Sequence, residues 1–119
     1  MDGVRSLDEI YAFYRDDKTI DYSRSTMLRF LDLVADVLRS KPLFYSTSHA
    51  RLGISRFGTW TESTENPSIM IVPDDRWVSL VYHESWDDGL LIRKRWDEIK
   101  CLVENARTPL LEMLARLRV

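Results

Sequence analysis

A change of hydrophobic period at Pro42 is the sequence feature that most constrains the fold. Before it, from about Ser23 to Ser40, apolar residues recur at three- and four-residue steps, which predicts an amphipathic helix. The apolar residues of this helix are Met27, Phe30, Leu31, Val34, Val37 and Leu38. The helix should stop at Lys41, because a residue that precedes proline is pushed out of the helical region. After Pro42 the pattern is that of strands, so the chain should combine helices with a sheet.

A shorter helix is predicted near the N-terminus. Ser6-Leu7-Asp8-Glu9 is a capping box, in which the Ser6 hydroxyl and the Glu9 carboxylate accept hydrogen bonds from each other's backbone amides. The apolar residues that follow cover one broad face. We expect this helix to end near Asp16.

The middle of the chain has the residue pattern of strands and turns. Strands are expected at 43–45, 50–55, 68–72, 77–83 and 90–95, with a bend at 46–49, a bulge at Gly53 and a hairpin turn at 73–75. In the segment 77–83 both faces carry apolar side chains, which is typical of an interior strand. Trp77, Ser79 and Val81 should share one face, and Val78, Leu80 and Tyr82 the other.

Helical spacing returns from about Asp97, with Thr108 as a cap and Pro109 in the first turn, so two short helices or one kinked helix should close the chain. No linker or repeat divides the sequence. Residues 1–119 are therefore predicted to form a single α+β domain. It should have N-terminal helices, a central antiparallel sheet of three to five strands, and a C-terminal helix or helix pair packed on the sheet.

Bulk composition narrows the class of protein. With 119 residues, of which 45% are hydrophobic, the chain can bury a core without disulfides or a metal. A net charge of −2 disfavours nucleic acid as a partner, and Arg93-Lys94-Arg95 is the only basic run. The single cysteine, Cys101, cannot form an intrachain disulfide and indicates a reducing compartment. We expect a cytoplasmic protein with no signal peptide and no membrane span.

Signatures of catalysis are missing from the sequence. It contains no glycine-rich phosphate loop, no Gly-x-Ser-x-Gly elbow, no His-Glu-x-x-His and no Asp-rich calcium loop. Cys101 lies among apolar residues, which predicts a buried and unreactive thiol. We therefore expect no cofactor and no metal site, and we favour a binding protein over an enzyme.

Acidic residues are concentrated between Glu62 and Asp88, where Arg76 is the only basic residue. Aromatic residues of the same stretch could anchor a partner whose surface is basic. The predicted partner-binding residues are Glu62, Glu65, Asp74, Asp75, Trp77, Tyr82, Glu84, Trp86, Asp87 and Asp88, and Trp60 is a further candidate anchor. The competing interpretation is that these acidic residues are simply exposed to solvent and bind no partner, since turns favour Asp and charges deter strands from aggregating.

Three hypotheses follow. The leading one is a non-enzymatic protein-binding module, in concrete form a bacterial immunity or antitoxin-type inhibitor that covers the basic cleft of a toxin such as a nuclease. The second is a small-molecule-binding protein or small enzyme with a pocket between helices and sheet. That pocket would be lined by His49 and His83 together with Phe44, Tyr45 and Trp77. The third is a homodimer that pairs through the last helix or an edge strand.

Overall fold

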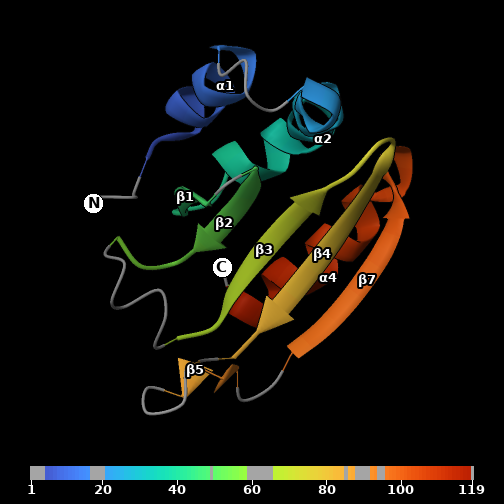
Figure 1. The fold of residues 1–119 in the computed structure, drawn as a ribbon. Helices are drawn as coiled ribbons and strands as arrows, with labels where there is room; N and C mark the ends of the chain where they lie inside the picture. Colours follow the sequence, from blue (N-terminus) through green and yellow to red (C-terminus); the bar gives the residue numbers. More distant parts are fainter. Residues whose placement is uncertain are drawn as a thin grey trace.

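Three helices and a five-stranded antiparallel sheet form most of the described part of the computed structural model, which covers residues 5–16, 21–48, 50–58, 66–84, 86–87, 92–93 and 96–118 (Figure 1). The helices are α1 (Leu7–Asp16), α2 (Asp21–Arg39) and α4 (Arg107–Leu117), and a 3-10 turn, η1 (Val103–Asn105), precedes α4. The sheet order is β1 (Phe44–Ser48), β2 (Arg51–Ser55), β3 (Ser68–Pro73), β4 (Trp77–His83) and β7 (Trp96–Leu102). A separate two-stranded ribbon pairs β5 (Trp86–Asp87) with β6 (Ile92–Arg93). The predicted α+β fold is confirmed.

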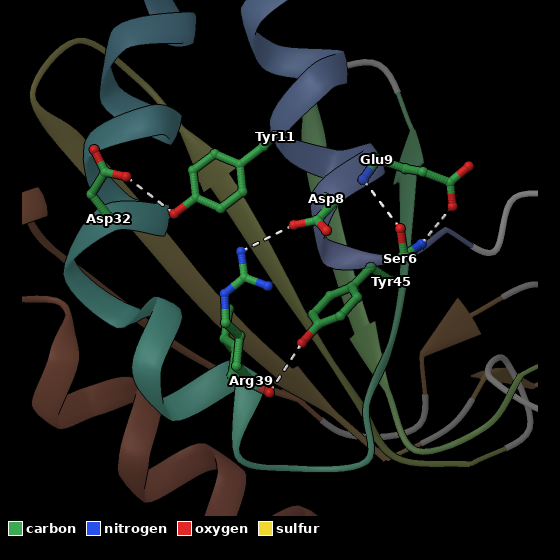
Figure 2. Close-up of polar contacts among 8 residues, drawn as sticks. Ser6, Asp8, Glu9, Tyr11, Asp32, Arg39 and Tyr45 are labelled. Atoms are coloured by element: carbon green, nitrogen blue, oxygen red, sulfur yellow. Dashed lines mark hydrogen bonds and ion pairs between the residues drawn. The ribbon is translucent and has the colours of Figure 1, made fainter.

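The capping box predicted at Ser6 is formed (Figure 2). The Ser6 backbone amide donates to Glu9 Oε1 at 2.8 Å, and the Glu9 amide donates to Ser6 Oγ at 3.2 Å. These two bonds satisfy backbone amides that have no partner within the helix, and α1 ends at Asp16 as predicted. The second helix ends at Arg39, two residues before the Lys41-Pro42 pair that was expected to stop it.

Polar contacts between α1 and α2 lie at the margin of a buried core (Figure 2). The Tyr11 hydroxyl donates to Asp32 Oδ1 at 3.1 Å, and Arg39 Nη2 donates to Asp8 Oδ1 at 3.1 Å. The Arg39–Asp8 pair is exposed, and exposed ion pairs contribute little to stability. The association of the two helices therefore depends on their apolar faces, which are fully buried at Ile10 of α1 and at Phe30 and Leu31 of α2.

All three helices pack on the same face of the sheet. The sheet residues of the core alternate along the strands and share one cluster with the buried residues of α1, α2 and α4. Those sheet residues are Tyr45, Leu52, Ile54, Ile69, Ile71, Val78, Leu80 and Tyr82. We call the opposite face the open face. The strand β4 is interior, as predicted, because it pairs with β3 on one side and β7 on the other.

The prediction of a helix from Asp97 is wrong, because Trp96–Leu102 forms strand β7. Ile99 and Cys101 lie opposite Leu80 and Val78 of β4, so pairing with a distant strand overrides the local helical spacing. A single helix, α4, closes the described chain, and its N-cap is Ala106. Thr108 is therefore not the cap, although Pro109 lies in the first turn as expected.

Two details of the predicted β1–β2 region are also wrong. Ser46 to Ser48 continue β1 instead of forming a bend, and His49 lies outside the described residues. Gly53 is not a bulge, because it occupies an uninterrupted register between Ser46 and Met70. A Cβ at this position would lie 2.6 Å from Ser46 Oγ, so a larger residue here would require the Ser46 side chain to move.

Candidate functional site

The turn between β3 and β4 brings two of the predicted carboxylates next to a predicted aromatic anchor. Asp74 and Asp75 are both exposed. The Asp75 amide donates to Asp74 Oδ1 at 2.8 Å, and the Asp74 amide donates to the Trp77 carbonyl at 2.8 Å. Arg76 has a φ of 63°, a left-handed conformation that closes the turn. We call residues Asp74 to Trp77 the acidic turn.

Two other elements fix the backbone of the acidic turn. The Arg76 amide donates to Thr26 Oγ1 of α2 at 3.2 Å, and the Arg76 carbonyl accepts from the Val103 amide of η1 at 2.9 Å. The Thr26 side chain is itself buried. Because both backbone groups of Arg76 are bonded to packed elements, the turn is held in one conformation before any partner arrives.

Trp77 gives the acidic turn its aromatic surface. It is the first residue of β4, lies on the open face opposite Leu102, and is 42% exposed. Lys100 Nζ lies 5.8 Å from the centre of its ring, within the range of a cation–π contact. Among the described residues, no basic side chain forms an ion pair with Asp74 or Asp75. The turn therefore presents unneutralised negative charge beside an accessible indole.

Tyr82 lies on the other side of the sheet from Trp77. It is 5% exposed, and the Arg116 guanidinium of α4 lies 3.9 Å from the centre of its ring. Arg116 also donates to Asp97 of β7 at 2.8 Å. Tyr82 therefore belongs to the packing of α4 on the sheet, and we leave it out of the candidate surface.

The remaining predicted residues are not beside the acidic turn, or lie outside the described residues. Glu84 follows the far end of β4, and a seven-residue strand separates the two ends by about 20 Å. Trp86 and Asp87 form β5, just beyond Glu84. Glu62, Glu65, Asp88 and Trp60 lie outside the described residues. The described acidic residues of the stretch thus form two groups, one at each end of β4.

His83 occupies a buried polar site on the open face. Its Nε2 lies 3.0 Å from Ser68 Oγ, and Ser55, the next residue along the same row, is also buried. The segment after β2 folds against this end of the face, since a Cβ at Gly58 would lie 3.3 Å from the Phe44 ring. A serine beside a histidine could supply a nucleophile and its base, but the two are 7% and 4% exposed and offer a substrate little access.

The second hypothesis placed a pocket between helices and sheet, and the described lining residues do not converge there. Tyr45 faces the helices, whereas Phe44, Trp77 and His83 belong to the open face. His49, the other predicted imidazole, lies outside the described residues. His83 therefore cannot line a cavity under the helices.

Possible metal ligands and the single thiol are the other reactive groups of the described chain. There, no group of three or more His, Cys, Asp or Glu side chains is placed to hold a metal ion. Cys101 is partly buried, and burial raises the pKa of its thiol, which lowers the fraction of reactive thiolate. No helix in the same described ranges is both long and apolar enough to span a membrane.

Sequence reasoning missed one exposed element, the edge strand β7. Asp97, Glu98, Ile99 and Lys100 are all exposed on it. The signal was the alternation of Glu98 and Lys100 with Ile99 and Cys101, which has the two-residue period of a strand. The helical spacing of Ile99, Leu102 and Val103 concealed that signal.

Comparisons of the chain with models of known protein families, with curated proteins and with solved structures found no match.

Proposed function

We propose that this protein is a non-enzymatic protein-binding module whose acidic turn contacts a basic surface on another protein. The observation that carries the proposal is the juxtaposition of Asp74 and Asp75, both exposed, with the 42%-exposed Trp77. Carboxylates accelerate the approach of a basic partner, and an aromatic side chain slows its departure once the indole is covered. The bonds from Thr26 and Val103 reduce the entropy that binding would otherwise cost.

More concretely, we propose that the protein is a cytoplasmic inhibitor of the bacterial immunity or antitoxin type, which covers the basic cleft of a toxin. Such a partner would present several Lys or Arg side chains to the acidic turn. The second acidic group, with Glu84 and β5, lies about 20 Å away along β4, within the span of a standard-size protein interface. Glu62, Glu65 and Asp88 remain predicted members of the same surface.

A photo-crosslinking amino acid at position 75 tests this proposal in cells of the native host. The same crosslinker at position 112, an exposed residue of α4, is the control. We expect a partner with a basic surface to be captured at position 75 and not at position 112. Equal capture at both positions, or capture at position 112 alone, would contradict the proposal.

Binding kinetics with the captured partner then test the role of charge. Asp75→Lys is a cleaner change than Asp74→Lys, because the Asp74 carboxylate accepts a backbone bond within the turn. Glu112→Lys makes the same change in net charge on α4 and serves as the matched control. We expect Asp75→Lys to slow association about tenfold at low ionic strength and to flatten its salt dependence, because it removes steering. Trp77→Ala should instead speed dissociation. Association rates that are equal for Asp75→Lys and Glu112→Lys would remove the acidic turn from the binding surface.

A further inference from the structure

The two edges of the five-stranded sheet differ in how they are covered (Figure 1). At the β1 edge the backbone amide of Arg5 donates to the Tyr45 carbonyl at 2.7 Å, so the N-terminal segment occupies part of that edge. At the opposite edge, β7 pairs with β4 on its inner side, and no strand of the described chain pairs with its outer side. Alternate residues along β7 therefore present unpaired backbone donors and acceptors at this edge, while the residues between them bond to β4.

Side chains on this free edge differ between the two faces of the sheet. Ile99 lies on the helix-covered face, opposite Leu80, yet it is 39% exposed. Glu98 and Lys100 lie on the open face, on either side of Ile99 along the strand. Asp97 forms an ion pair within the chain, in which Arg116 donates to its carboxylate at 2.8 Å. Within the described residues, Glu98 and Lys100 form no ion pair, and Lys100 lies 5.8 Å from the centre of the Trp77 ring; the two opposite charges are placed symmetrically about an exposed apolar residue.

We propose that β7 binds the β7 strand of a second copy of this chain, antiparallel, about a two-fold axis that passes beside Ile99. In this register Ile99 meets Ile99 of the second copy, and Glu98 lies directly opposite Lys100 of the second copy, twice by symmetry. Directly opposed unlike charges and apolar pairs both stabilise an antiparallel ladder. The two sheets would join into one, with the helices of both copies on the same side.

Charge selects this register over its neighbours. A two-fold axis perpendicular to the sheet brings one residue opposite itself, and residues equally distant from it opposite each other. If the axis moves to Glu98, two glutamates face each other, and if it moves to Lys100, two lysines do. Like charges directly opposite destabilise a strand pair. The Ile99 axis is the one of these three that pairs Glu98 with Lys100.

The dimer should be weak and dependent on concentration, because one edge strand buries less surface than a standard interface. The acidic turn meets this interface only through Lys100, which contacts Trp77. Trp77 lies opposite Leu102, and Leu102 is three residues along β7 from Ile99. Trp77 is therefore about 10 Å from the axis in the strand direction. The two acidic turns would point toward opposite ends of the joined sheet. This inference goes beyond the proposed function and does not depend on it.

Sedimentation equilibrium of the full chain over a wide concentration range tests the dimer. We expect the wild-type protein to dimerise, and the single variants Glu98→Lys and Lys100→Glu each to weaken dimerisation about tenfold, because each replaces two unlike pairs with two like pairs. The double variant carrying both changes should dimerise as the wild type does. Both positions are exposed, so circular dichroism and melting temperature should stay near those of the wild type.

Mixing the two single variants tests the register itself. In a heterodimer of Glu98→Lys with Lys100→Glu, both charged pairs across the interface join a lysine to a glutamate. The mixture should therefore associate more strongly than either variant alone. A wild-type protein that stays monomeric at all concentrations would overturn the proposal, and the charges on β7 would then serve to block association. A dimer that neither single variant weakens would also overturn it, because the contact would lie elsewhere.

Discussion

Replacing Arg76 with glycine should stabilise the protein. Arg76 has a φ of 63°, and an L-residue in the left-handed region loses about 1–2 kcal/mol relative to its ordinary conformations. The backbone cannot rotate out of this conformation cheaply, because the Arg76 amide bonds to Thr26 and its carbonyl to Val103. Glycine adopts the same φ without a Cβ clash.

The size of the effect is the difference of two terms. Glycine removes about 1–2 kcal/mol of strain, but its greater freedom in the unfolded chain costs roughly 0.4–1 kcal/mol. The Arg76 side chain is exposed and forms no ion pair within the described residues, so its loss should change stability little. We expect a net gain of about 1 kcal/mol in the free energy of unfolding, or about 4 °C in melting temperature.

Urea denaturation of three proteins measures this gain. Arg76→Ala is the matched control, because it removes the same side chain and the same charge but keeps the Cβ. It should lie within about 0.5 kcal/mol of the wild type, whereas Arg76→Gly should be more stable than both. If Arg76→Gly proves no more stable than Arg76→Ala, then the left-handed conformation stores no strain and the reasoning fails.

Three further predictions concern a buried hydroxyl, an ion pair and the single thiol. Thr26→Val should lower the free energy of unfolding by about 1–2 kcal/mol and speed hydrogen exchange of the Arg76 amide, because it deletes a buried acceptor, and Thr26→Ser, which keeps the hydroxyl, should do neither. The bidentate contact with Arg107 lowers the pKa of Asp36 from 3.8 to about 2, so carboxyl NMR should show that pKa rising toward its ordinary value in Arg107→Gln. Because the folded pKa is the lower one, the stabilisation is present above pH 3.8 and is lost as the pH falls toward 2, so the melting temperatures of wild type and Arg107→Gln should converge over that window. Since burial raises the pKa of Cys101, a thiol reagent at mildly alkaline pH should react more slowly with the native chain than with the chain in urea, and equal rates would contradict this account.

Local interactions account for the parts of the fold that sequence reasoning predicted well. The capping box at Ser6 and Glu9 involves residues three positions apart, so the bonds that start α1 are specified within its first turn. The apolar period of α2 is local in the same sense. The strand β7 is different, because its conformation depends on pairing with β4, whose residues lie some distance away in the sequence. Local spacing at Ile99, Leu102 and Val103 fits a helix, so it led to a wrong prediction for this segment.

Only part of the candidate site was predictable, for two reasons. Residues that are close in the sequence need not be close on the surface, because β4 is long enough to place Asp75 and Glu84 at opposite ends of the sheet. Alternation along β4 separated Trp77 from Tyr82 on the basis of sequence alone, yet both faces were apolar, so the sequence did not show which face the helices cover. That depends on α4, which packs against Tyr82 through Arg116.

The acidic turn and the β7 edge are physically linked, although they are proposed to bind different molecules. Val103, which bonds to the Arg76 carbonyl, directly follows the last residue of β7, and Leu102 lies opposite Trp77. A second copy paired along β7 would therefore reduce the motion of the strand that supports the turn. It would also join two acidic turns in one particle, and two sites on one particle bind a clustered or symmetric partner more tightly than either site alone. Binding of a single partner molecule in solution requires one turn only, so the two proposals can be tested and rejected independently.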